Sequence, residues 1–136
     1  MRTVSLIAAA GIVLVAIQPV FAVQTFDGLW ASSKRDCRDR EGPDSKTMID
    51  LDNVIKGKPA PLVDRYENHC RIDRKTPAGD GLVLSATCFE FWDDYKKGVN
   101  GSKVTIKLVP GANGSIKIDG KPHLLCKRKD DLPKAR

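Results

Sequence analysis

Cys70 and Cys88 lie in two strand-like segments, Leu62–Asp73 and Gly81–Trp92, on either side of a short turn-rich run. If the chain folds back about Gly79, these two cysteines face each other across an antiparallel ladder. Directly opposed residues in such a ladder have Cβ atoms about 4.5–5.5 Å apart, which suits a disulfide. The sequence therefore predicts a hairpin that is closed by a Cys70–Cys88 bond.

Alternation along both segments supports this pairing, because successive side chains of a strand point to opposite faces. One face carries the cysteines and mostly apolar neighbours: Tyr66, Asn68, Cys70 and Ile72 on the first segment, and Leu82, Leu84, Ala86 and Cys88 on the second. The other face of the first segment is charged and is predicted to be solvated: Arg65, Glu67, His69, Arg71 and Asp73. A single register thus places both cysteines inward.

Cys37 and Cys126 complete a set of four cysteines. An even number of cysteines in a short exported chain is typical of disulfides formed in an oxidising compartment. The chain has no C-x-x-C pair, so neither a zinc site nor a thioredoxin-like redox centre is expected. Three pairings are open in principle. We favour Cys70–Cys88 with Cys37–Cys126, which would tie the two ends of the domain together.

The N-terminal segment has the three-part pattern of a secretory signal peptide. Arg2 supplies the positive charge, residues 6–17 form an apolar run that is short for a membrane span, and Val20-Phe21-Ala22 offers small residues for cleavage. The alternative is an uncleaved N-terminal anchor. We expect a signal peptide at 1–22, a single domain at 23–129 and a polar tail at 130–136. The mature chain would then be periplasmic or secreted, with no transmembrane segment after signal cleavage.

Further segments alternate in the same way. Strands are predicted at Lys46–Leu51, Ser102–Val109, Ser115–Ile118 and Pro122–Lys127. Asp119-Gly120 is a strong signal for a two-residue hairpin turn. In the last segment Leu125 matches the apolar face of the preceding strand whereas Cys126 does not, so the orientation of that segment stays open. We expect an all-β fold, a small antiparallel barrel or sandwich of about six to eight strands with two disulfides.

The chain is basic, with a formal net charge of +6 at pH 7. Such an excess favours weak contact with anionic surfaces such as polysaccharides or phospholipid headgroups, although a solvated basic surface is the simpler explanation. An exported chain without an aromatic and basic recognition motif is not expected to bind nucleic acid.

Residue types that support catalysis are few. The two histidines, His69 and His123, have no nucleophile at a recognisable spacing. A cation site would need the loops that carry four carboxylates to converge: Asp50, Asp52, Asp93 and Asp94. The sequence therefore predicts a protein that is not an enzyme, with no catalytic residue, no cofactor and no metal site.

Gly28-Leu29-Trp30 lies at the start of the first strand expected after the signal peptide. This Gly-x-Trp resembles the opening motif of lipocalin-type barrels, in which the tryptophan closes the barrel base and the glycine permits a tight entry. A buried tryptophan after a turn glycine would give the same residues. With its four cysteines, the chain also resembles small exported bacterial β proteins of unassigned activity. The lipocalin-like resemblance implies a carrier of a small apolar ligand.

Four aromatic residues gather at the end of the second cysteine segment. With Cys88 inward, Phe89 and Phe91 point outward, next to Trp92 and near Tyr95. Outward aromatic side chains predict a binding patch, but residues 93–100 or a second sheet could cover them, or a bulge could reverse the faces. We expect an exported, non-enzymatic binding module, inhibitor-like in build, that binds an unknown macromolecular partner through this patch. The lipocalin-like carrier is the alternative.

Overall fold

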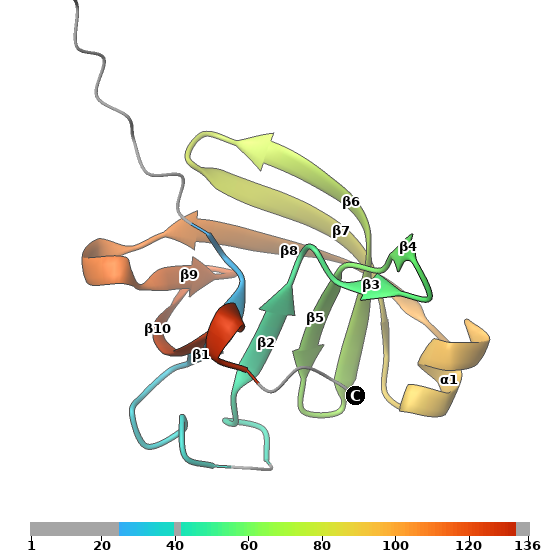
Figure 1. Ribbon diagram of the computed structural model, residues 1–136, viewed down its shortest axis with the longest axis horizontal. Helices are drawn as coiled ribbons and strands as arrows, with labels where there is room; N and C mark the ends of the chain where they lie inside the picture. The colour runs from blue at the N-terminus through green and yellow to red at the C-terminus, as the bar shows by residue number, and fades with distance from the viewer. Residues whose placement is uncertain (1–24, 40–41, 133–136) are drawn as a thin grey trace, which may run out of the picture.

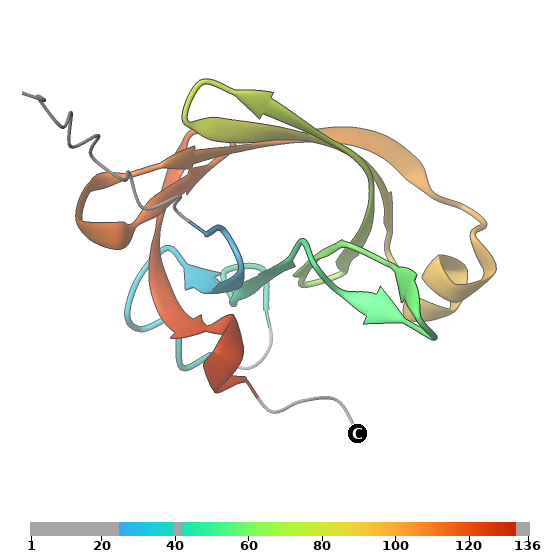
Figure 2. The same ribbon diagram turned by 45° about the horizontal axis from the view of Figure 1, so that its top comes forward.

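The computed structural model describes residues 25–39 and 42–132, so the predicted signal peptide at 1–22 lies outside the described residues. Eight antiparallel strands form a closed barrel in the order β1-β10-β9-β8-β7-β6-β5-β2 (Figures 1 and 2). These strands are β1 (Gly28–Ala31), β2 (Thr47–Asp50), β5 (Leu62–Arg65), β6 (Asn68–Ala78), β7 (Gly81–Phe89), β8 (Ser102–Pro110), β9 (Ile116–Ile118) and β10 (Lys121–Arg128). The predicted all-β fold with two disulfides is confirmed, and the barrel is the arrangement observed.

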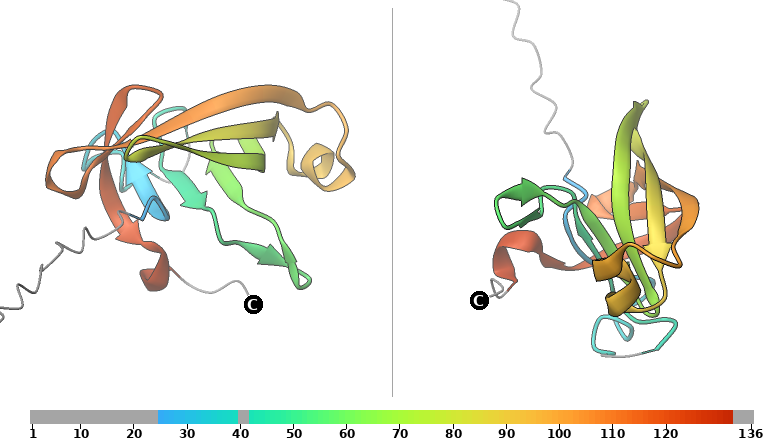
Figure 3. Two further views of the ribbon diagram at one scale, coloured as in Figure 1. Left: turned by 90° about the horizontal axis from the view of Figure 1, so that it is seen from above. Right: turned by 90° about the vertical axis from the view of Figure 1, so that its right-hand side faces the viewer.

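The remaining elements lie outside the barrel wall. Two short strands, β3 (Val54–Ile55) and β4 (Lys58–Pro59), form a separate hairpin, and helix α1 (Trp92–Lys97) follows β7. Two 3-10 turns span Ala112–Gly114 and Lys129–Asp131. The β3–β4 hairpin and α1 project from the barrel at separate places (Figure 3). Among the described residues, no helix has the length and apolar character that a membrane crossing requires.

The cysteine hairpin forms between β6 and β7 as predicted. Cys70 lies directly opposite Cys88, and the two are joined by a disulfide. Strand β6 is longer than expected, because it continues to Ala78 and the chain turns at Gly79-Asp80. The cysteine register is nevertheless kept, because Asp73 is an extra, unpaired residue in the ladder. Across this β-bulge the inner face of β7 keeps its even-numbered residues, whereas the β6 residues opposite them change from even-numbered to odd-numbered, from Ile72 opposite Ala86 to Lys75 opposite Leu84.

The segment 62–73 is not a single strand as predicted. A tight turn at Tyr66-Glu67 divides it into β5 and β6, with Glu67 at a φ of 49°. Tyr66 therefore lies in a turn and is exposed, instead of sharing the inner face with Cys70. Neither central residue of the turn is Gly, Asn or Pro, the types that usually mark a hairpin, so sequence patterns did not reveal it. Similarly, the second segment ends as a strand at Phe89, and Trp92 begins α1.

Strand β10 closes the barrel against β1. Trp30 pairs with Leu125 and Leu29 pairs with Lys127, which leaves Cys126 as the extra residue of a second bulge. This bulge explains the mismatch between Leu125 and Cys126 that left the orientation of the segment open. Cys126 forms its disulfide with Cys37, as predicted.

Glycine is required where β1 approaches β10. Gly28 has a φ of 144°, and a Cβ atom there would lie 2.8 Å from the carbonyl oxygen of Lys127. Two residues later, the buried Trp30 donates a hydrogen bond from Nε1 to the carbonyl oxygen of Phe26 over 2.8 Å. The Gly-x-Trp pattern thus reflects a close strand approach and an inward tryptophan. The resemblance to lipocalins itself stays a prediction.

Inward-facing side chains fill the barrel. They form one apolar cluster: Phe26, Trp30, Ile49, Leu51, Val63, Cys70, Ile72, Leu84, Ala86, Cys88, Ile106, Leu108, Ile116 and Ile118. The Cys70–Cys88 disulfide is part of this core. The protein has two intramolecular disulfides, Cys70–Cys88 and Cys37–Cys126, which are typical of a protein from an oxidising compartment. The predicted polar tail at 130–136 begins within the 3-10 turn Lys129–Asp131, and residues 133–136 lie outside the described residues.

Candidate binding surface

Helix α1 begins at Trp92, and Glu90 and Phe91 separate it from the end of β7 at Phe89. Asp93 and Asp94 lie in its first turn and Lys96 and Lys97 in its last, which complements the helix dipole at both ends. Gly98 ends the helix in the left-handed conformation, with a φ of 69°, and its N–H donates to the carbonyl oxygen of Asp94 over 2.7 Å. This short helix is therefore well capped at its C-terminus.

A row of outward-facing residues crosses three strands next to α1. Asp64 of β5 pairs with His69 of β6, and His69 pairs with Phe89 of β7. The row continues to Gly101, where a Cβ atom would lie only 2.6 Å from the Phe89 ring. Glycine at this position therefore leaves the space that the Phe89 ring occupies.

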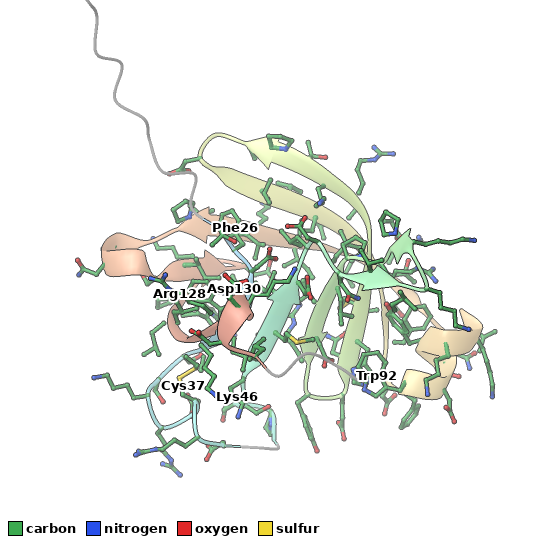
Figure 4. The ribbon with its side chains drawn as sticks, viewed as in Figure 1. Phe26, Cys37, Lys46, Trp92, Arg128 and Asp130 are labelled. Carbon is green, nitrogen blue, oxygen red and sulfur yellow. A yellow bond between two sulfur atoms is a disulfide. The ribbon has the colours of Figure 1, made fainter. Side chains whose placement is uncertain are left out.

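Four rings from the barrel wall and α1 pack together, and we call His69, Phe89, Trp92 and Tyr95 the aromatic cluster. His69 stacks on Trp92, with ring centroids 4.0 Å apart and an angle of 21° between the planes. Tyr95 meets Trp92 edge-on at 5.1 Å and Phe89 edge-on at 5.5 Å. Stacked and edge-to-face pairs at these distances are favourable geometries for aromatic side chains. The aromatic cluster therefore holds α1 against β6 and β7. Figure 4 shows its one labelled member, Trp92, beside α1.

Charged groups surround the aromatic cluster. His69 Nδ1 lies 2.6 Å from Asp64 Oδ1, which fixes the orientation of the imidazole beneath Trp92. The Arg71 guanidinium lies 5.6 Å from the centre of the Phe89 ring, within the range of a cation–π contact. Burial raises the pKa of the Tyr95 phenol, an effect that the positive charge of Arg71 opposes in part. Tyr95 therefore stays neutral at physiological pH.

The four residues predicted as a binding patch are brought together, but their exposure differs. Phe89 is only 2% exposed, because α1 and Gly101 cover it. Tyr95 is half-buried. Phe91 and Trp92 are 59% and 40% exposed. The residues that can meet a partner are thus Phe91 and Trp92, whereas Phe89 and Tyr95 support them from below. Their role in binding stays a prediction.

Sequence patterns did not identify His69 and Asp64 as parts of this surface. His69 was expected on a solvated face, but its side chain is only 12% exposed because Trp92 covers it. The signal was present in the hairpin register, because the Cys70–Cys88 pairing also places His69 opposite Phe89. Asp64 was hidden by the unrecognised turn at Tyr66-Glu67, which pairs it with His69.

No group of three or more His, Cys, Asp or Glu side chains in the part of the chain that the structure describes is arranged to hold a metal ion. Near α1 the surface has a wide, open depression lined by Phe91, Trp92, Asp93 and Asp94. An open surface of this kind suits contact with a macromolecule better than enclosure of a small substrate. Comparison with protein-family models, with curated proteins and with solved structures yields no match.

Proposed function

We propose that this protein is an exported, non-enzymatic binding module of the cell envelope or periplasm, which binds a macromolecular partner through Phe91 and Trp92. The single observation that carries the proposal is the 59% exposure of Phe91, which directly precedes Trp92, the first residue of the helix that the aromatic cluster holds in place. Aromatic side chains are enriched at protein interfaces, where they supply large contact areas at a low cost in conformational entropy. A rigidly mounted aromatic pair suits such a contact.

Export is supported by the predicted signal peptide and by the two disulfides, which form in oxidising compartments. One form such a module can take is an inhibitor of an envelope enzyme. The alternative function, a carrier of a small apolar ligand, has less support, because core side chains occupy the barrel interior where that ligand would bind.

The experiment is capture of a partner from an envelope extract of the host by the immobilised protein, with identification by mass spectrometry. Phe91→Ala should abolish capture and leave Tm unchanged, because this side chain makes few contacts within the fold. Val54→Ala is the matched control, because Val54 is 58% exposed but lies on the β3–β4 hairpin. Capture that is equal for the wild type and Phe91→Ala would reject the site.

A further inference from the structure

A second hollow, distant in sequence from α1, lies at the mouth of the barrel. It has a volume of about 510 Å³, and its lining includes Asp27, Trp30, Leu125, Arg128, Lys129 and Asp130. Figure 4 shows Phe26, Arg128 and Asp130 near one another at this end of the molecule. Barrel mouths are common places for small-molecule sites, and the volume is within the usual range of such sites.

Asp27 is the most unusual polar group in this hollow. Its Oδ1 accepts a hydrogen bond from the Leu51 backbone N–H over 2.7 Å. Burial raises the pKa of Asp27 despite this hydrogen bond and the nearby positive charge of Lys129. Ionised Asp27 is therefore poorly solvated, and a positively charged ligand group beside it would relieve that cost.

Of the other charged side chains at the mouth, some form ion pairs and some do not. Lys129 Nζ lies 2.6 Å from Asp50 Oδ1, and Asp52 lies 4.0 Å from Lys75 Nζ. Arg128 and Asp130 have no ion-pair partner among residues 25–39 and 42–132. A guanidinium and carboxylates that line the same hollow can bind opposite charges of one ligand.

The mouth also has an apolar part. Leu125 is 36% exposed although it pairs with the buried Trp30 across β1 and β10. Trp30 also lines the hollow, and its indole N–H is hydrogen-bonded to the Phe26 carbonyl oxygen. A ligand side chain that covers Leu125 would remove apolar surface from water.

We propose that the barrel mouth binds a zwitterionic compound of the amino-acid or dipeptide class. The ligand ammonium group binds Asp27, its carboxylate binds Arg128, and its apolar side chain covers Leu125. This site is separate from Phe91 and Trp92 and does not depend on the function proposed for them. It also differs from a lipocalin-type cavity, because the ligand lies at the mouth above the filled core.

The test is titration of uniformly ¹⁵N-labelled protein with glycyl-leucine, followed by NMR. The indole N–H of Trp30 is the reporter, because its hydrogen-bond partner, Phe26, adjoins Asp27. The indole N–H of Trp92 serves as an internal control. Two further probes each lack one charge: glycyl-leucinamide lacks the carboxylate and N-acetyl-glycyl-leucine lacks the ammonium. We expect the dipeptide to shift the Trp30 signal but not the Trp92 signal, and each blocked probe to bind about tenfold more weakly or worse.

Two variants test the assigned residues. Asp27→Asn keeps an oxygen that can accept from Leu51 N–H, and Arg128→Gln keeps a polar side chain, so the fold should survive both changes. Each should weaken dipeptide binding about tenfold. Asp119→Asn is the matched control, because Asp119 also accepts a backbone N–H, from Lys107 over 2.8 Å, but does not line the mouth.

Several results would overturn the proposal. One is a Trp30 signal that stays in place up to about 10 mM dipeptide. Another is a blocked probe that binds as well as the dipeptide, because this would mean that one ligand charge is not recognised. Equal binding by Asp27→Asn and the wild type, with both proteins folded, would likewise reject the site.

Discussion

His69 and Trp92 stack face to face between the barrel wall and α1, with ring centroids 4.0 Å apart. Asp64 holds the imidazole from the other side, through a 2.6 Å contact with Nδ1. Because Trp92 is the first residue of α1, this stack sets where the helix and the neighbouring Phe91 lie on the surface. The exposed aromatic pair is thus positioned by a histidine from a neighbouring strand.

Replacing His69 with alanine should loosen α1 without unfolding the barrel. An aromatic pair contributes about 0.5–1.5 kcal/mol, so amide exchange in the helix should become about two- to tenfold faster. Native-state hydrogen exchange at the Tyr95 and Gly98 amides, which donate within the helix, measures this change. His123→Ala is the control, and unchanged exchange in His69→Ala would show that the stack does not hold the helix.

Gly101→Ala should destabilise the protein by about 1–3 kcal/mol, as overpacking commonly does. The added Cβ would lie 2.6 Å from both the Phe89 ring and Thr87 Cγ2, so at least one of these groups must move. Urea unfolding measures the loss. The double variant Gly101→Ala with Phe89→Leu should lose less than the sum of the two single changes, because a smaller side chain relieves part of the clash. Strict additivity would contradict this account.

The two disulfides should respond differently to a mild reductant. Cys37 and Cys126 are half-buried and line a surface depression, whereas Cys70 and Cys88 are buried in the core. A phosphine reductant should therefore open Cys37–Cys126 first, and Cys70–Cys88 only when the barrel unfolds. Timed alkylation with peptide mass mapping distinguishes the two bonds. Faster reduction of Cys70–Cys88 in folded protein would contradict the burial argument.

The negative charges of Asp27 and Asp73 should change the free energy of unfolding in opposite directions. Hydrogen bonds from Lys103 and Thr87 hold the pKa of Asp73 below its ordinary value of 3.8, so the charged form favours folding. This stabilisation is present above that value and is lost as the pH falls through the lower, folded-state pKa. Asp73→Asn should therefore cost about 0.5–1 kcal/mol at neutral pH and little in strong acid.

For Asp27 the sign is reversed. Burial raises its pKa above 3.8, so the folded state binds the proton more tightly and stability decreases as the pH rises through the two pKa values. Asp27→Asn should raise Tm at neutral pH, and the gain should disappear in acid below pH 3.8. Thermal unfolding across the pH range measures both variants. A lower Tm for Asp27→Asn at neutral pH would mean that its charge is satisfied in the fold.

Much of the fold followed from local patterns. Alternation predicted the inward faces of β7 and β8, and Asp119-Gly120 forms the expected turn, with φ of 50° and 81°. The Cys70–Cys88 bond followed from the register of its hairpin, whereas Cys37–Cys126 was only the favoured pairing for the other two cysteines. These features depend on residues that are close in sequence or directly paired, so their signals are present in short segments.

The binding surface was only partly predictable. The aromatic residues 89–95 were conspicuous in the sequence, but their exposure depends on how α1 folds back over Phe89. The bulges at Asp73 and Cys126 leave no distinct residue signature, because each is defined by the partner strand. The same is true of the barrel mouth, where Asp27 accepts a hydrogen bond from the N–H of Leu51, just after β2, and lines one hollow together with Arg128 of β10.

Patterns in short stretches of the chain were enough to predict most of the barrel strands, the Cys70–Cys88 bond and the inward side chains of its hairpin. Three features arise only when distant segments meet in the folded barrel: β10 closes on β1, Trp92 covers His69, and Asp27 becomes half-buried at the mouth. The physical reason is that alternation and turn chemistry act between near neighbours along the chain. Ring closure, burial and stacking depend on segments that meet only after the barrel has formed.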